Sequence, residues 1–194
     1  MSRIYVETSI PSFYHEVRTE PTMVARRQWT REWFDAAVAR VELVTSAAVL
    51  DELERGDFPG RTDAMAMIQE LSPLRIGQRV RTLGILSGGL SSDYPGYSQS
   101  QGKIPPLIVP AVLKEIVKEY IDRQLMPADP SGDALHLALA SYYACDFLVT
   151  WNCKHLANAN KFGHIAQVNR IMKLAVPSLV TPLELLGTGT NDNA

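Results

Sequence analysis

Four residues that lie far apart in the sequence have side chains that could together hold a divalent cation: Glu7, Glu52, Asp133 and Asn152. Carboxylate and amide oxygens are hard ligands of the kind that Mg²⁺ and Mn²⁺ prefer. An ion held by such ligands can acidify a water molecule, orient it towards a phosphodiester and offset the charge of the leaving oxygen. If these side chains meet, the chemistry they predict is metal-dependent hydrolysis of a phosphodiester.

Each of these residues, taken alone, has an ordinary structural explanation. Glu52 belongs to the run DELE, any acid of which could lie on a solvated helix face. Asp133 in the first turn of a helix is favourable with the helix macrodipole whatever its function, and Asn152 after a strand is typical of a turn. Glu7 is harder to explain in this way, because few reasons place an acid at the end of a buried strand. The combination therefore indicates a site.

The elements around these residues predict a parallel sheet. Predicted strands cover residues 3–6, 41–45, 74–76, 146–150 and 178–182, and predicted helices cover residues 22–40, 47–55, 62–71, 111–125, 133–145 and 153–173. Strands that alternate with helices of this length favour an α/β fold, a three-layer α/β/α sandwich with a central, mainly parallel sheet. The predicted N-caps of three of the helices are Ser46, Thr62 and Ser131.

In such a sheet every strand ends at the same edge, and ligands gather there beside the helix N-termini. Glu7 and Asn152 follow predicted strands, whereas Glu52 and Asp133 lie in the first two turns of predicted helices. We therefore expect all four side chains at one edge of the sheet. Three carboxylates held close together repel one another unless a cation offsets their charge, which again favours a metal site.

Three stretches of the sequence resemble the PIN-domain family, and in particular the VapC-type toxins of toxin–antitoxin pairs. They are YVETSIPSFY from residue 5, VLDEL from residue 49 and DALHLALASYYACDFLVTWNCKHL from residue 133, and the resemblance covers residues 3–56 and 110–184. On this resemblance Glu7 matches the family's first acid, which is usually Asp, Glu52 the second and Asp133 the third. Asn152 stands where many members of the family have a fourth Asp.

The resemblance implies an endoribonuclease that uses Mg²⁺ or Mn²⁺ and leaves a 5′-phosphate and a 3′-hydroxyl. Glu7, Glu52 and Asp133 would be its metal ligands, and the Thr8 and Ser9 hydroxyls would support a water molecule or a phosphate. RNA would be the substrate, and a small antitoxin protein or a second copy of the chain would be a partner. Because Asn152 lacks the charge of an Asp, the alternative is a catalytically inactive PIN-like module that binds RNA or a protein. A phosphatase would need an early D-x-D motif, which VETS does not provide.

Several other side chains have two interpretations. His136, one turn after Asp133, is either an active-site hydrogen-bond partner or a packed helix residue. A zinc site of His136, His155 and Asp133 lacks the usual ligand spacing. Trp151 either stacks a base or covers the sheet edge. Two groups of arginines either lie on solvated faces or contact RNA phosphates, and an aromatic stripe is either core or an interface. The two arginine groups are Arg26, Arg27 and Arg31, and Arg75, Arg79 and Arg81. The aromatic stripe consists of Trp29, Trp33, Phe34, Ala37 and Val38.

The length and composition predict a single domain. The chain has 194 residues, 46% of them apolar, and a formal net charge of −2. We expect one PIN-like domain over residues 1–186 with an inserted loop at 84–106, and a disordered tail over 187–194. Two cysteines are too few for a disulfide framework, and the sequence shows neither a signal peptide nor an apolar run long enough to cross a membrane. These features favour a cytoplasmic protein with free thiols.

Overall fold

A parallel sheet lies at the centre of the protein. The computed structural model describes residues 1–73 and 111–187. Its strands are β1 (Arg3–Val6), β2 (Glu42–Thr45), β3 (Ser72–Pro73), β4 (Phe147–Val149) and β5 (Ser178–Val180). They follow the order β3-β2-β1-β4-β5, and every neighbouring pair is parallel. The predicted α/β class is confirmed, and within the described residues the sheet is wholly rather than mainly parallel.

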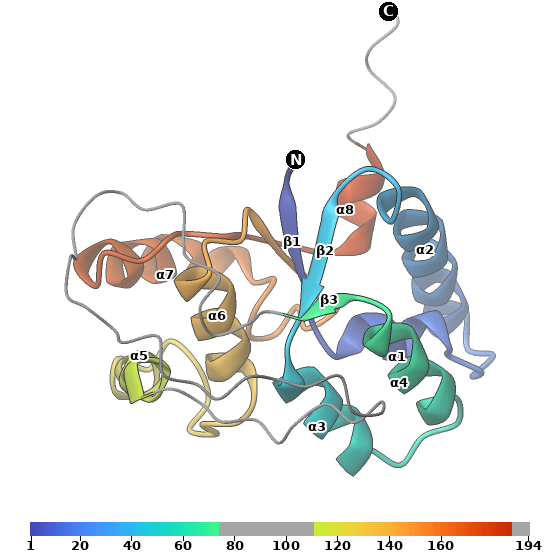
Figure 1. The fold of residues 1–194 in the computed structure, drawn as a ribbon, viewed down its shortest axis with the longest axis horizontal. Helices are drawn as coiled ribbons and strands as arrows, with labels where there is room; N and C mark the ends of the chain where they lie inside the picture. Colours follow the sequence, from blue (N-terminus) through green and yellow to red (C-terminus); the bar gives the residue numbers. More distant parts are fainter. Residues whose placement is uncertain (74–110, 188–194) are drawn as a thin grey trace, which may run out of the picture.

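Helices cover both faces of this sheet. They are α1 (Ser9–Tyr14), α2 (Pro21–Ala37), α3 (Ala47–Arg55), α4 (Arg61–Gln69), α5 (Ala111–Asp122), α6 (Asp133–Tyr142), α7 (Ala159–Ile171) and α8 (Pro182–Leu186). Helices α1, α2, α4 and α8 pack together on one side, and α5, α6 and α7 lie on the other (Figure 1). The arrangement is the three-layer sandwich that the alternation of strands and helices predicts.

The strand β1 lies in the middle of the sheet, where the side chains after Arg3 are covered on both faces. Ile4, Tyr5 and Val6 are all buried, as expected for a strand covered by helices on each side. At the edge of the sheet where the strands begin, Arg3 pairs in register with Glu42 of β2. The Arg3 Nε lies 3.0 Å from the Glu42 carboxylate. The acid at this edge therefore has a basic partner.

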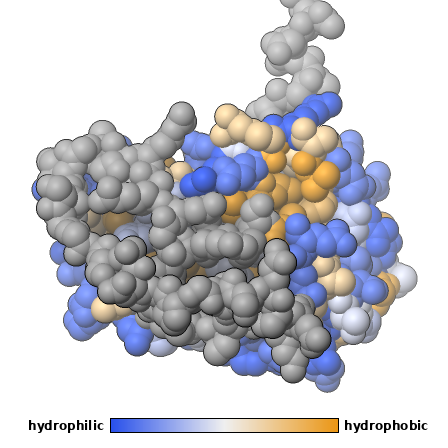
Figure 2. All heavy atoms as spheres, in the orientation of Figure 1, coloured by the Kyte–Doolittle hydropathy of each residue, from blue (hydrophilic) through white to orange (hydrophobic). Residues whose placement is uncertain are grey.

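The aromatic stripe of α2 is part of the core. Trp33 and Phe34 are buried, and α8 packs on α2. The stripe ends earlier than predicted, since α2 ends at Ala37 and Val38 is 56% exposed. On the face seen in Figure 2, apolar side chains gather over the region of β2, α2 and α8, whereas polar side chains cover the outer side of α2. The core interpretation of the stripe is confirmed, with Val38 as its exception.

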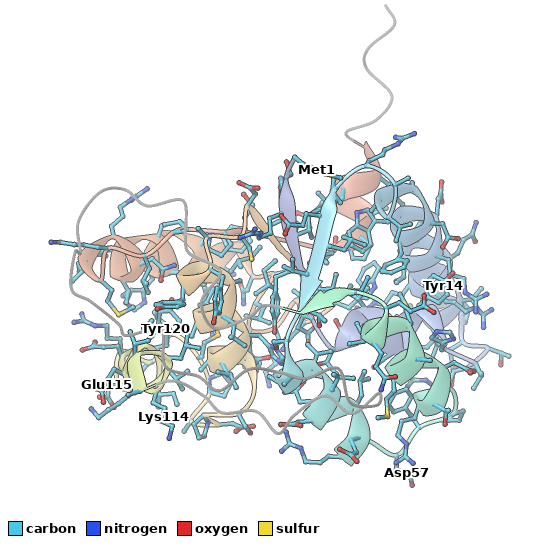
Figure 3. All side chains as sticks on the ribbon, viewed as in Figure 1. Met1, Tyr14, Asp57, Lys114, Glu115 and Tyr120 are labelled. Carbon is cyan, nitrogen blue, oxygen red and sulfur yellow. The ribbon has the colours of Figure 1, made fainter. Side chains whose placement is uncertain are left out.

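A buried polar chain joins the three helices of the other layer. The Tyr120 hydroxyl donates to Asn169 Oδ1 at 2.6 Å, and Asn169 Nδ2 donates to Ser141 Oγ at 2.9 Å. Figure 3 shows Tyr120 on the inner side of α5, with Lys114 and Glu115 pointing outwards. Burial raises the pKa of Tyr120 to about 12, so its hydroxyl remains a donor at neutral pH. These bonds tie α5 and α7 to α6, the helix that carries Asp133.

Helix starts differ from the predictions where a side chain has another partner. Ser46 occupies the N-cap position of α3 but makes no capping bond, because its hydroxyl contacts Tyr5. The N-cap of α4 is Gly60, whose φ of +85° favours glycine, rather than Thr62. The N-cap of α6 is Gly132, since the Ser131 hydroxyl donates to Asp129. The cap predictions for Thr62 and Ser131 are therefore wrong.

Other boundaries moved by a few residues. The helix predicted over 153–173 begins only at Ala159, because the Asn158 side chain caps it by accepting from the Asn160 N–H. The sequence did not predict α1. The predicted strand 74–76, the insertion 84–106, Arg75, Arg79 and Arg81, and almost all of the tail lie outside the described residues. Among the described residues, no helix is both long enough and apolar enough to cross a membrane.

Candidate metal centre

The candidate site lies where the strand order reverses. From β1 the sheet continues through β2 and β3 on one side and through β4 and β5 on the other. In parallel sheets, the carboxyl ends of the two strands at such a reversal form the crevice that binds ligands. Glu7 follows β1 directly, and its N–H donates to Val149 of β4 at 3.3 Å. Thr150 to Asn152 leave β4 beside it, so both segments enter this crevice.

Glu7 is buried and is held by three donors. Glu7 is 6% exposed. Its Oε2 accepts hydrogen bonds from the Ser9 N–H at 3.0 Å, the Ser9 hydroxyl at 2.5 Å and the Thr150 hydroxyl at 2.7 Å. The Ser9 N–H is available because α1 starts at Ser9, and helix N-termini have free N–H groups. Charge-assisted bonds of this kind stabilise a buried carboxylate and fix its orientation.

Glu52 reaches the same crevice from the second turn of α3. Its Oε2 accepts from the Thr8 hydroxyl and lies 3.1 Å from His136 Nε2. Burial raises the pKa of Glu52, but His136 and the Thr8 hydroxyl lower it by more, so that its pKa is below the ordinary value. The neighbouring acid Glu54 is exposed, as expected for the solvated side of α3. Of these two acids, only Glu52 faces the site.

His136 lies on α6 with its ring completely inside the protein, 1% exposed. Burial lowers the pKa of His136, but the Glu52 carboxylate, helped by Glu7 and Asp133, raises it to above the ordinary value. Its Nε2 has no hydrogen-bond partner among the described residues, so the 3.1 Å contact with Glu52 is electrostatic. This nitrogen is a buried polar atom that faces a carboxylate without a well-directed bond.

The other ring nitrogen of His136 is anchored by a buried chain of hydroxyls. The Tyr5 hydroxyl lies 2.9 Å from His136 Nδ1 and 2.7 Å from Ser46 Oγ. Tyr5 is fully buried and Ser46 is 3% exposed, so these groups bind each other rather than water. Burial raises the pKa of the Tyr5 hydroxyl well above the ordinary value, and it therefore stays protonated. The chain fixes the plane of the imidazole ring.

Asp133 and Asn152 form a second pair in the crevice. Asn152 Nδ2 donates to Asp133 Oδ1 at 2.8 Å, and Asn152 Oδ1 accepts from the His155 N–H at 3.1 Å. These two contacts together define which end of the amide is which. Burial raises the pKa of Asp133 above the ordinary value, which means that its ionised form lacks enough compensating charge. Asn152 thus presents N–H groups to Asp133, and its oxygen is occupied by the backbone.

The structure brings together Glu7, Glu52 and His136, each with one ligand atom within 4.8 Å of the others. Asp133 is not part of this group, although its charge acts on His136 and Glu52, and its role as a ligand stays a prediction. The Thr8 and Ser9 hydroxyls donate to Glu52 and Glu7 and thereby orient the acids. Contacts of these hydroxyls with water or phosphate also remain predictions.

These residues fit a divalent cation. In the described part of the chain, no Lys or Arg lies within ion-pair distance of Glu7, Glu52 or Asp133. The hydrogen bonds found there to Glu7 and Glu52 all go to Oε2, so that Oε1 of each carboxylate is uncommitted. Uncommitted oxygens and an unpartnered imidazole nitrogen are donors that a metal ion can use. The cluster can therefore hold a metal ion.

The surroundings of the site decide between the two interpretations of Trp151, whereas RNA contact by the arginines of α2 stays a prediction. Trp151 is 7% exposed and its Nε1 donates to the Thr30 hydroxyl at 2.7 Å, so it covers the sheet edge as a buried ring. Arg26 lies over the Trp151 ring at 5.2 Å, while Arg27 and Arg31 donate to backbone carbonyls. The ligand group does not include His155, which gives the three-residue zinc site no support from this geometry.

Sequence reasoning missed Tyr5, Ser46 and Thr150. Thr150 could have been found by the argument that found Glu7, because it too follows a buried strand directly. Tyr5 carried a weaker signal, since a Tyr within a buried strand needs a polar partner for its hydroxyl. Ser46 carried none, because its position predicts a helix cap.

Fold and site together define an α/β protein with a buried acidic cluster at the carboxyl edge of its parallel sheet. Comparison of the chain with protein-family models, with curated proteins and with solved structures found no match.

Proposed function

We propose that the protein is a metal-dependent endoribonuclease that resembles PIN-domain toxins. The observation that carries the proposal is the cluster of Glu7, Glu52 and His136 at the reversal of the strand order, with two carboxylates and no Lys or Arg partner in the described residues. A divalent ion held there would stabilise the charge that develops on a phosphodiester and would acidify an attacking water molecule.

The residues of the chain divide this work among them. Glu7 and Glu52 would hold the ion through their uncommitted oxygens, with their orientation fixed by Ser9, Thr150 and Thr8. Asp133, whose pKa is raised by burial, is the carboxyl group best placed to hold or take up a proton near the substrate. Asn152 orients Asp133 through its amide N–H.

The proposal is tested by cleavage of single-stranded RNA in the presence of Mn²⁺. Glu52→Gln and Asp133→Asn should each lower the cleavage rate by at least about a hundredfold, because the first removes a charged metal ligand and the second removes the group that exchanges a proton. Glu54→Gln is the matched control, since Glu54 lies on the same helix but is exposed. Equal cleavage by Glu52→Gln and Glu54→Gln would contradict the proposal.

The ends of the RNA product give an independent check. Water activated at a metal site leaves a 5′-phosphate and a 3′-hydroxyl, the outcome that the family resemblance implies. Attack by the RNA 2′-hydroxyl, which needs no metal, leaves a cyclic phosphate instead. A cyclic product would therefore indicate a different enzyme, including a contaminant, even if RNA is degraded.

The toxin role extends this proposal to a partner. If the chain acts as a toxin, its expression should arrest growth, and the Asp133→Asn variant should not. A short protein encoded next to it should restore growth and bind the chain. Growth arrest by both wild type and Asp133→Asn would separate toxicity from cleavage.

A second candidate function is a catalytically inactive module that binds RNA or a protein. Two observations favour it: the Asn152 amide replaces a carboxylate beside Asp133, and the Glu52 charge already has a partner in His136. This candidate predicts no heat of Mn²⁺ binding in calorimetry, whereas the ribonuclease proposal predicts binding that is lost in Glu52→Gln.

A further inference from the structure

The ring of His136 is more tightly specified than a packed helix residue requires. It is 1% exposed, its Nδ1 is bound within a buried hydroxyl chain, and its Nε2 lies 3.1 Å from the Glu52 carboxylate without the geometry of a hydrogen bond. A buried polar atom without a partner costs free energy, and natural structures rarely contain one without a reason. The orientation of this ring therefore needs an explanation that Glu7 and Glu52 alone do not give.

The hydroxyl chain on Nδ1 supplies the first part of that explanation. Tyr5 can accept from an Nδ1–H and donate its own proton to Ser46 Oγ, at the observed 2.9 and 2.7 Å. With that direction of donation, the proton of a neutral ring lies on Nδ1 and the lone pair of Nε2 faces the carboxylates. Metal-binding histidines have this arrangement, in which a hydrogen bond to one nitrogen fixes the tautomer and orients the other.

The spacing of the ligand atoms supplies the second part. Ligands at right angles on an ion with bonds of about 2.1 Å lie about 3.0 Å apart. His136 Nε2 lies 3.1 Å from the Glu52 carboxylate, and Glu7, Glu52 and His136 each have one ligand atom within 4.8 Å of the others. Ligands on opposite sides of such an ion would lie about 4.2 Å apart, so the group needs a contraction of at most about 0.6 Å.

We propose that His136 Nε2 is a direct nitrogen ligand in the Glu7–Glu52 site, and that the site consequently selects Mn²⁺ or a later divalent metal over Mg²⁺. Imidazole suits ions from Mn²⁺ to Zn²⁺, whereas Mg²⁺ requires oxygen ligands in near-ideal octahedral geometry. The inference rests on the metal site of the proposed function and adds the nature of the ion. Tyr5 and Ser46 act in it as positioning residues.

The decisive measurement is pulsed electron paramagnetic resonance of the Mn²⁺-loaded full chain. Wild type should show coupling between Mn²⁺ and a directly bound nitrogen, and His136→Gln should lose it. His155→Gln is the matched control and should retain it, because His155 lies outside the ligand group. A spectrum without nitrogen coupling, or coupling lost in His155→Gln instead, would overturn the inference.

Calorimetry measures the selectivity. Wild type should bind Mn²⁺ at least about tenfold more tightly than Mg²⁺, and His136→Gln should lower Mn²⁺ affinity about ten- to hundredfold with little effect on Mg²⁺. Tyr5→Phe keeps the ligand but removes its anchor, so it should retain nitrogen coupling and bind Mn²⁺ more weakly. If His136→Gln fails to fold, the wild-type spectrum and Tyr5→Phe still decide the question.

The outcome is separate from that of the ribonuclease proposal. Mn²⁺ bound without nitrogen coupling, together with RNA cleavage, would overturn this inference and leave the ribonuclease standing. Nitrogen-coupled Mn²⁺ without RNA cleavage would support this inference and overturn the ribonuclease.

Discussion

The substitution Thr150→Val tests how the buried carboxylate of Glu7 is held. Thr150 is fully buried, and its hydroxyl donates to Glu7 Oε2 at 2.7 Å while it accepts from the Asn152 N–H at 2.8 Å. Valine has nearly the same shape and the same branching at Cβ, so the change removes these two bonds, a longer contact with the Ser9 hydroxyl at 3.3 Å, and little else. A bond to a charged group contributes about 1.5–3 kcal/mol, and one between neutral groups about 1 kcal/mol.

The loss of stability should be smaller than the sum of these two contributions. Glu7 keeps the two donors of Ser9, and the Asn152 N–H lies at a partly exposed position where water can replace Thr150. We therefore expect Thr150→Val to lower the free energy of unfolding by about 1.5–3 kcal/mol. Urea denaturation at neutral pH without metal measures it, provided that the slope of free energy against urea stays unchanged.

Thr45→Val is the matched control. Thr45 is 2% exposed and ends the neighbouring strand β2, but the bond from its hydroxyl, to the Val6 carbonyl, is long at 3.4 Å. It should cost less than about 1 kcal/mol. Equal losses for the two variants would refute the conclusion that Thr150 holds Glu7. If the acids bind Mn²⁺, Thr150→Val should also weaken that binding about tenfold, and Thr45→Val should not.

Three further predictions concern other contacts of the described residues. Asn152→Asp should destabilise the metal-free protein by about 2 kcal/mol or more, because a carboxylate would replace the donor to Asp133, and Mn²⁺ should restore part of the loss in thermal unfolding. Asp133→Asn should stabilise the metal-free protein at neutral pH. Burial raises the pKa of Asp133, so the wild type loses stability as the pH rises from the ordinary Asp pKa through the raised one. The stability gained by Asp133→Asn should therefore fade when urea denaturation is repeated below the ordinary Asp pKa. Gly60→Ala should cost more than about 2 kcal/mol in the same assay, since φ is +85° and a Cβ would lie 2.8 Å from the His15 carbonyl.

The sequence predicts much of the fold because strands and helices differ in period. The buried strand at residues 3–6 and the strand before Thr150 are runs of apolar residues, and α2 and α5 show the helical pattern. Failures occur where one local contact decides the outcome. The six residues of α1 are too few to show a period, and Asn158 delays the start of α7 by capping it. Such contacts depend on partners that sequence spacing does not specify.

The site was predictable to the level of which edge of the sheet it occupies. Glu7 and Glu52 meet there because the order of strands and helices along the chain places both residues at that edge. The direction of the Asn152 amide was not predictable, because it depends on one carboxylate and one backbone N–H brought together only by the fold. The position of His136 also depends on how α6 is rotated, and sequence spacing does not distinguish a packed residue from an active-site hydrogen-bond partner.

The acids at the two edges of the sheet have different partners, although the chain can place a basic residue beside an acid at a sheet edge. At the amino-terminal edge, the Arg3 guanidinium pairs with Glu42 at 3.0 Å, and the backbone N–H of Arg3 donates to the Asp146 carboxylate at 2.8 Å. At the carboxyl edge, the acids are more deeply buried, and among residues 1–73 and 111–187 their basic partner is a histidine, although burying a carboxylate costs more free energy there. Stability alone would favour the first arrangement at both edges, so the difference between the edges supports the proposed metal site. A cation from solution would balance at this edge the charge that Arg3 balances at the other.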